Sequence, residues 1–360
     1  MASFAVKDAQ DAHLPGIAQL AFDENASAAR DVEAYGRLWK RLHWSGPYQR
    51  AKVLVGVDTE TDRVVGHYAM IPFAFRRDGQ PLGKGGFVCE LRVAQACRNT
   101  LLFPQLELKI LSSYVPEGLD FAYGLINKPD VLKAHLAFKF KPVCVLPVFA
   151  RPVRAGKVIP QVVKSKALRT LLRPLEPIGN FVLSKLRWPS DRGVAITQVE
   201  RFLPEHAAAL DTLTRQFHLA AERTVESLNW RFAAFEDRHY KIFLATRNGA
   251  LIGYVVTRTM PMKDLTALAV VDILFSPDDE ATANVLINVA LEEAKKQRVD
   301  VCVALLNPQG RYYPLLRNRL FVKTPETFTV ILHEPRQPRH HLTATKASDW
   351  HFTWFDHDFV

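Results

Sequence analysis

Hydrophobic and polar positions follow the same order twice along this chain. Each half begins with two segments whose apolar residues recur every three or four positions, which predicts a pair of amphipathic helices. An alternating hairpin pattern follows, then an apolar strand carrying one acid, a helix and a buried strand. In the first half these elements are helices over Asp11–Phe22 and Asp31–His43, hairpin strands over Lys52–Val57 and Arg63–Phe75, a strand over Phe87–Val93, a helix over Pro104–Val115 and a strand over Asp120–Asn127. In the second half they are helices over Pro204–Phe217 and Thr224–Phe235, hairpin strands over Tyr240–Thr246 and Ala250–Met260, a strand over Leu268–Phe275, a helix over Glu280–Arg298 and a strand over Asp300–Asn307.

Matched residues indicate that the two halves arose by duplication. The matches are Gly66 with Gly253, Glu90 with Asp272 and Asn127 with Asn307, at separations of 187, 182 and 180 positions. A length of 360 residues also suits two domains rather than one. We therefore expect two tandem α/β domains, each a mixed, mainly antiparallel sheet flanked by helices. The expected parts are an N-terminal domain (1–150), a basic linker (151–193), a C-terminal domain (194–335) and an aromatic tail (336–360).

Composition narrows the class of protein. A hydrophobic fraction of 48% and a charged fraction of 23% are those of an ordinary globular protein. The sequence has no apolar run long enough to span a bilayer and no export signal at its start. The four cysteines are scattered without CxxC spacing, which argues against a disulfide framework and against a metal site. We expect a cytoplasmic protein that uses no metal.

The net charge of +10 is concentrated in one segment. Between Arg151 and Arg192 there are ten basic residues and two acidic ones, interleaved with apolar residues. This pattern suits either a solvated linker or an amphipathic dock for an anionic partner, such as the inner membrane face, an acidic carrier protein or a phosphorylated glycan intermediate. Nucleic acid is disfavoured, because neither half has a recognition-helix pattern or an aromatic RNA signature.

The order of elements, together with four motifs, resembles the GNAT acyltransferase superfamily. The motifs are Gly66–Pro72, Val93–Phe103, Tyr123–Asn127 and Trp350–Asp358. The resemblance is strongest to tandem GNAT proteins often associated with bacterial polysaccharide and cell-envelope pathways. It implies transfer of an acyl group, acetyl in the first instance, from acyl-CoA to an amino group of an amino sugar, a polysaccharide precursor or a related metabolite.

The same resemblance implies a donor site at the start of a helix in the first half. In the family the pyrophosphate of acyl-CoA binds backbone amides in a loop of pattern Arg/Gln-x-x-Gly-x-Gly/Ala, where unpaired N–H groups and the helix dipole favour an anion. Leu101 stands at a glycine position of this pattern, and the second half has acids at the corresponding place, as expected of a non-catalytic copy. A backbone N–H near Val93 would bind the acyl oxygen. The residues expected to hold the donor are Val93, Arg98, Asn99, Thr100, Leu101, Leu102, Phe103 and Asn127.

Acid and base candidates follow from the chemistry of acyl transfer, which needs a base for the amine and an acid for the leaving thiolate. Glu90 matches the family's base, although a strand carboxylate held in a salt bridge is an equal alternative. Lys133 replaces the usual tyrosine acid, and His135 is the candidate substitute, or else a surface or helix-capping histidine. Strand alternation predicts that His67 packs in the core.

The end of the chain carries a further expectation. Trp350, Phe352 and Trp354 alternate as in a strand, so the tail should be packed. Some tandem GNAT enzymes bring a C-terminal carboxylate into the first domain's site, and Asp356, Asp358 or Val360 would supply it here; an ordinary packed tail is the alternative.

Two other functions compete with acyl transfer. A GNAT-derived binding or scaffold protein would explain Leu101, Lys133 and Ala137 at motif positions. A Fem-like aminoacyltransferase, which takes its donor from tRNA, also pairs two such domains, but the long helical-hairpin insertion of that group is not evident.

Overall fold

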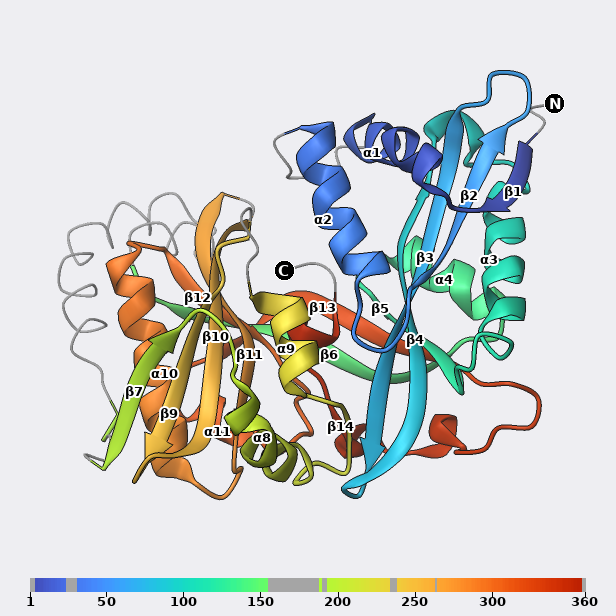
Figure 1. Ribbon diagram of the computed structural model, residues 1–360. Helices are drawn as coiled ribbons and strands as arrows, with labels where there is room; N and C mark the ends of the chain where they lie inside the picture. The colour runs from blue at the N-terminus through green and yellow to red at the C-terminus, as the bar shows by residue number, and fades with distance from the viewer. Residues whose placement is uncertain are drawn as a thin grey trace, which may run out of the picture. The chain divides into compact units, whose positions relative to one another are not determined.

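The computed structural model describes residues 4–23, 31–154, 188–189, 193–233, 238–262 and 264–357. Contacts divide the chain into two compact units: unit 1 is Met1–Cys144 with Thr329–Lys346, and unit 2 is Val145–Phe328 with Ala347–Val360. Each unit is a mixed, mainly antiparallel sheet flanked by helices, so the predicted fold class is confirmed (Figure 1). Most of the basic linker, residues 155–187 and 190–192, lies outside the described residues.

Unit 1 begins with a strand that the sequence pattern did not predict and then follows the expected order. Its elements are β1 (Phe4–Asp8), α1 (Leu14–Asp23), α2 (Val32–Trp44), β2 (Lys52–Asp58), β3 (Val64–Arg77), β4 (Gln80–Val93), α3 (Leu102–Ser113), β5 (Phe121–Ile126) and α4 (Pro129–Ala137). The sheet order is β1-β2-β3-β4-β5-β13, where β13 is Val322–His333. The pair β4 and β5 is parallel, and the neighbours on either side of it are antiparallel.

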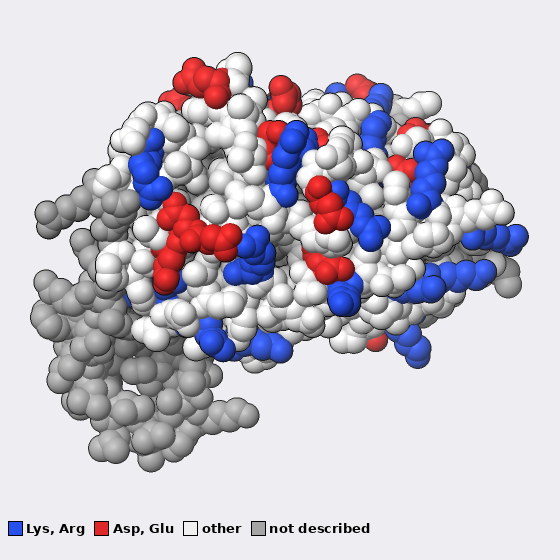
Figure 2. Space-filling view, turned by 90° about the horizontal axis from the view of Figure 1, so that it is seen from below, with Lys and Arg blue, Asp and Glu red and all other residues white. Residues whose placement is uncertain are grey.

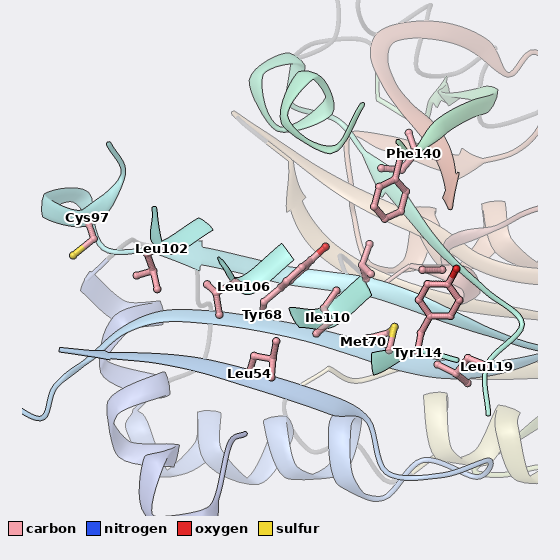
Figure 3. Packing of buried hydrophobic residues seen from close by; sticks show 13 residues of the cluster. Leu54, Tyr68, Met70, Cys97, Leu102, Leu106, Ile110, Tyr114, Leu119 and Phe140 are labelled. Carbon is pink, nitrogen blue, oxygen red and sulfur yellow. The ribbon is translucent and has the colours of Figure 1, made fainter. Parts of the chain in front are cut away.

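The helices of unit 1 cover opposite faces of this sheet (Figure 1). Asp31 caps α2 by accepting a hydrogen bond from the Ala34 amide at 2.8 Å, and α2 then buries one side, which includes Trp39. On the other face α3 buries apolar residues spaced four apart. Figure 3 shows Leu102 and Leu106 of α3 close to the side chains that β2 and β3 contribute to this core.

Unit 2 repeats much of this order. Its elements are β7 (Val194–Val199), α8 (Ala207–Thr214), β8 (Leu219–Ala221), α9 (Val225–Phe232), β9 (Lys241–Arg247), β10 (Ala250–Met262), β11 (Leu265–Phe275), α10 (Glu280–Lys296), β12 (Val301–Leu305), α11 (Tyr313–Arg317) and β14 (Trp350–His351). The sheet order is β6-β12-β11-β10-β9-β7, where β6 is Lys141–Pro152, and β11 and β12 are parallel. Asn248 and Gly249 both have positive φ at the β9–β10 turn, which confirms the predicted hairpin.

Each unit contains a strand from the other half of the sequence. The last residues of β13 pair antiparallel with β5 and complete the sheet of unit 1, from Thr329 opposite Ile126 onward. The last residues of β6 pair antiparallel with β12 and complete the sheet of unit 2. The two contact units therefore differ from the contiguous blocks expected at 1–150 and 194–335.

The described end of the chain from residue 347 to 357 is packed within unit 2, but less of it is strand than expected. The alternating aromatic pattern predicted a strand over 350–354, whereas β14 ends at His351 and a 3-10 turn occupies Trp354–Asp356. Nearly every side chain in this stretch is buried, whichever way the alternation would point it. The alternating pattern therefore predicted too long a strand. Side chains that are buried on every side of the backbone can pack in a 3-10 turn as well as in a strand.

A buried ion cluster anchors this tail. The Arg223 guanidinium lies 3.0 Å from the Asp356 carboxylate and 3.5 Å from that of Asp272, and all three side chains are fully buried. Thr353 donates to Asp272 at 2.7 Å, and Tyr254 donates to the same carboxylate at 2.5 Å. Two carboxylates thus share one guanidinium as their counter-ion inside unit 2.

We predict that Arg223→Ala destabilises the protein by about 3 to 5 kcal/mol, because it leaves two buried carboxylates without a counter-charge. The free energy of unfolding in denaturant measures this. Arg215→Ala is the matched control: it removes an arginine that is half exposed and bound to Asp211 at 2.9 Å, and should cost less than about 1 kcal/mol. Equal losses in the two variants would contradict the anchoring role.

Candidate functional site

Strand β4 contains a bulge at Glu90. His67 pairs with Arg92 and Ala69 with Cys89, so two residues of β4 lie opposite Tyr68 alone. Glu90 has a φ of +53°, a left-handed conformation that is rare for a residue with a Cβ atom. A bulge of this kind turns a side chain away from the face that regular alternation would give it.

The bulge places Glu90 on the side of the sheet covered by α2. Val88 belongs to the core on the α3 side, and strict alternation would point Glu90 to that side as well. Instead Leu91 packs against this core, while Glu90 contacts His43 of α2. The extra residue in β4 is therefore what brings the carboxylate to α2.

Glu90 lies among basic side chains. One carboxylate oxygen is 3.4 Å from His43 Nε2 and 3.9 Å from His67 Nδ1, and the other is 3.3 Å from an Arg92 nitrogen. Arg92 also donates to the Tyr35 hydroxyl at 2.6 Å. The Glu90 side chain keeps 14% of its surface exposed, whereas both histidines are buried. The carboxylate is salt-bridged, as one reading of the sequence expected, and it is also the acid of this cluster that solvent reaches.

His67 holds the bulge as a neutral imidazole. Its Nδ1 donates to the carbonyl oxygen of Glu90 at 3.0 Å, and its Nε2 accepts from the Trp39 indole at 3.3 Å. Burial lowers the pKa of His67 to about 3. The sequence expectation that His67 packs in the core is confirmed, and the structure adds its hydrogen bonds to both neighbours.

The parallel pairing of β4 and β5 stops short of Glu90. It joins Gly85 to Phe121 and ends at Phe87 with Tyr123, although β4 continues to Val93 and β5 to Ile126. The two strands thus cease to share hydrogen bonds just before the bulge.

The loop that enters α3 has an ordinary backbone. Leu101 has a φ of −80°, so the conformation does not require glycine, and its side chain is 67% exposed. The Thr100 hydroxyl accepts from the Leu102 amide at 3.2 Å and occupies one of the first N–H groups of the helix.

The other residues expected at the donor site surround this loop. Arg98 is exposed and its Nε donates to the carbonyl oxygen of Val93 at 3.3 Å. Asn99 is exposed, as is Asn127 just after β5, while Phe103 is half-buried. Residues 98 to 101 therefore form the loop before α3, and Leu102 and Phe103 are the first residues of the helix.

His135 is buried, not at the surface. It lies on α4, 3.2 Å from the carboxylate of Glu107 on α3, and its ring contacts Phe103 and Phe140. Burial and this carboxylate raise the pKa of the nearby Tyr68. His67 and Tyr68 are consecutive in β3 and point to opposite faces, so the structure does not bring His135 into contact with Glu90.

Four residues that the sequence analysis did not name contribute to the side-chain clusters around Glu90 and around His135. They are Tyr35, His43, Arg92 and Glu107. His43 follows Trp39 by four positions on the buried side of α2, a spacing that indicates core packing. No motif marks any of them.

The tail carboxylates have separate outcomes. Asp356 is buried in unit 2 and bound to Arg223. Asp358 and Val360 lie outside the described residues, as does most of the basic segment.

On the face seen in Figure 2, acidic and basic side chains are interspersed over the described surface.

The described part of the chain contains neither a membrane-spanning helix nor a group of metal-ligating side chains. None of its helices is both long and apolar enough to cross a bilayer. Among its His, Cys, Asp and Glu residues, no three or more are grouped so that they could hold a metal ion.

Comparison with known proteins identifies the fold. No protein-family model and no curated protein sequence matches the chain. Solved structures do. Saccharomyces cerevisiae N-myristoyltransferase with bound myristoyl-CoA aligns over 94% of this chain and 84% of its own, at 14% identity and a TM-score of 0.63. The GCN5-related N-acetyltransferase of Kribbella flavida aligns over 92% of this chain and 71% of its own, at 15% identity and a TM-score of 0.58. That of Anabaena variabilis aligns over 92% of this chain and 72% of its own, at 11% identity and a TM-score of 0.61. The chain has a GNAT-like fold.

The low pKa of His67 makes folding of this GNAT-like chain sensitive to acid. The unfolded imidazole takes up a proton near pH 6.5 and the folded one only near 3, so stability present above pH 6.5 is lost as the pH falls. At pH 5 this amounts to about 2 kcal/mol. We predict that His67→Gln reduces the loss of unfolding free energy between pH 7.5 and 5 by this amount, measured in denaturant. The exposed His341→Gln should match the wild type, and an unchanged loss in His67→Gln would be inconsistent with a buried neutral imidazole.

Proposed function

We propose that the protein is an acyl-CoA-dependent N-acyltransferase whose active site is in unit 1. The observation that carries this proposal is the bulge in β4, which presents the Glu90 carboxylate where the pairing of β4 and β5 ends. Backbone groups released from a sheet ladder can bind the extended, amide-rich arm of acyl-CoA. The N-myristoyltransferase that aligns with this chain was solved with myristoyl-CoA bound, which supports the choice of donor.

The donor would bind on the α3 side of the sheet. Its phosphates would lie at residues 98 to 103, where the dipole at the start of α3 favours an anion. Arg98 supplies an exposed cation there. Val93 follows the bulge and would direct its backbone N–H to the acyl oxygen, and Asn127 at the end of β5 would border the donor from the other strand.

The acceptor amine would approach from the α2 side, where Glu90 is partly exposed. Glu90 takes a proton from the amine as the nitrogen attacks the thioester carbon, and the electron pair of the C–S bond leaves with sulfur. The acceptor class we propose, from the resemblance to tandem GNAT proteins, is an amino sugar, a polysaccharide precursor or a related metabolite. We assign His135 to the support of α3 through Glu107, and not to protonation of the thiolate.

We also infer that the units are tandem GNAT domains of which the second is inactive. In both, an acid at or next to a strand bulge contacts the residue that follows a matched glycine: Glu90 contacts His67, and Asp272 contacts Tyr254. Asp272, however, is fully buried and bound to Arg223. A carboxylate that is fully buried and ion-paired with an arginine cannot reach an acceptor amine.

For donor binding, we predict that acetyl-CoA and free CoA bind the protein and that Arg98→Ala weakens both by about tenfold, the loss of one charge-assisted contact to phosphate. Isothermal titration calorimetry measures this. The matched control is Arg63→Ala, which removes an exposed arginine from the turn between β2 and β3 and should leave affinity unchanged. Absence of binding at millimolar ligand would remove the CoA-dependent proposal.

For the chemical step, we predict that Glu90→Gln lowers kcat by about 100-fold while donor affinity stays near that of the wild type, because a base acts on the transition state and not on the donor. Steady-state kinetics with acetyl-CoA and a panel of amines gives kcat, and calorimetry gives affinity. Glu226→Gln, an exposed glutamate of α9, is the control. An unchanged kcat in Glu90→Gln would exclude Glu90 as the base.

A further inference from the structure

His43 is oriented so that one particular nitrogen faces Glu90. Its Nδ1 lies 2.9 Å from the carbonyl oxygen of Trp39, and a carbonyl oxygen only accepts, so Nδ1 carries a hydrogen. Nε2 is then the nitrogen that gains or loses a proton, and it lies 3.4 Å from the Glu90 carboxylate. The imidazole is 1% exposed, so Glu90 is its route to a proton from the acceptor.

The surroundings of His43 suit a protonated ring. The Trp39 indole stacks on the imidazole at 4.5 Å between centroids and 20° between planes, which favours a cation over its face. On the neighbouring strands, Glu90 of β4 lies 3.4 Å from His43 Nε2, and the His67 ring of β3 lies 6.3 Å away between centroids. Arg92 of β4 binds the other oxygen of Glu90.

The remaining neighbours do not compete for this proton. His67 already donates Nδ1–H to the carbonyl oxygen of Glu90 and accepts at its other nitrogen. Helix α1, which also packs against α2, carries Asp23, whose carboxylate accepts from Gln19 at 2.7 Å.

We propose that His43 is the resting place of the proton that Glu90 takes from the acceptor amine; this rests on the proposed function of the same site. As the N–C bond forms and the C–S bond breaks, the amine proton passes to Glu90 and on to His43 Nε2, which leaves an imidazolium beside a carboxylate. The departing sulfur takes a proton from solvent, and His43 returns its own through Glu90. His43 is a positioning residue, because it acts on the substrate only through Glu90.

Kinetics of a double-mutant cycle test this path. In His43→Gln the side-chain amide can still donate to Glu90 but cannot take up a proton. We expect a kcat about tenfold lower with unchanged KM values, and no further loss when Glu90→Gln is already present. Lys40→Gln, an exposed change on the same helix, should leave kcat unchanged. An equal loss from His43→Gln in both backgrounds would show a purely structural role and overturn the proposal.

A histidine titration supplies a readout that needs no turnover and no stable His43 variant. In the full-length protein labelled with 15N-histidine, we expect the His43 ring to protonate at a pH about one unit higher in the wild type than in Glu90→Gln, because the carboxylate stabilises the imidazolium. An unchanged midpoint would overturn the pairing. A shifted midpoint without detectable acyl transfer would support the proton pair and reject the proposed reaction instead.

Discussion

A left-handed residue in the middle of a paired strand costs about 1 to 3 kcal/mol, so the conformation of Glu90 needs contacts that hold it. His67 provides them from inside the protein: it donates to the Glu90 carbonyl oxygen and accepts from Trp39. The bulge in β4 is thereby tied to β3 and to α2 through one buried imidazole. The direction of the carboxylate and its contact with His43 both depend on this link.

The same position in unit 2 shows that a bulge alone does not make an acid available. The register of β10 and β11 also shifts beside Asp272, and Tyr254 donates to its carboxylate. There the carboxylate is fully buried, and Arg223 and Thr353 bind it as well. In unit 1 the corresponding carboxylate keeps part of its surface in solvent. Burial and a counter-ion therefore make Asp272 a structural anchor.

Sequence periodicity predicted most helices and strands because each amphipathic pattern reports a local geometry. Glu90 departs from that pattern as a lone acid in an apolar strand, and the family resemblance made it the candidate base. Periodicity did not predict that β6 pairs with β12 and β13 with β5. A strand shows the same alternation of apolar and polar residues whichever strand it pairs with. His43 and Glu107 escaped notice because they occupy core positions of amphipathic helices, where only the opposing side chains reveal an ion pair.

Leu101 separates two reasons for a glycine in a phosphate-binding loop. One reason is a backbone conformation that only glycine adopts easily. It does not apply here, because Leu101 has a φ of −80°, which any residue can adopt. The other is space for an anion at the amides. The helix start is already poor in free donors, because Thr100 occupies the Leu102 amide and Pro104 has no N–H. At the donor site that we propose, fewer amides would share the charge of a phosphate, so the exposed guanidinium of Arg98 would neutralise more of it than in a glycine-rich loop.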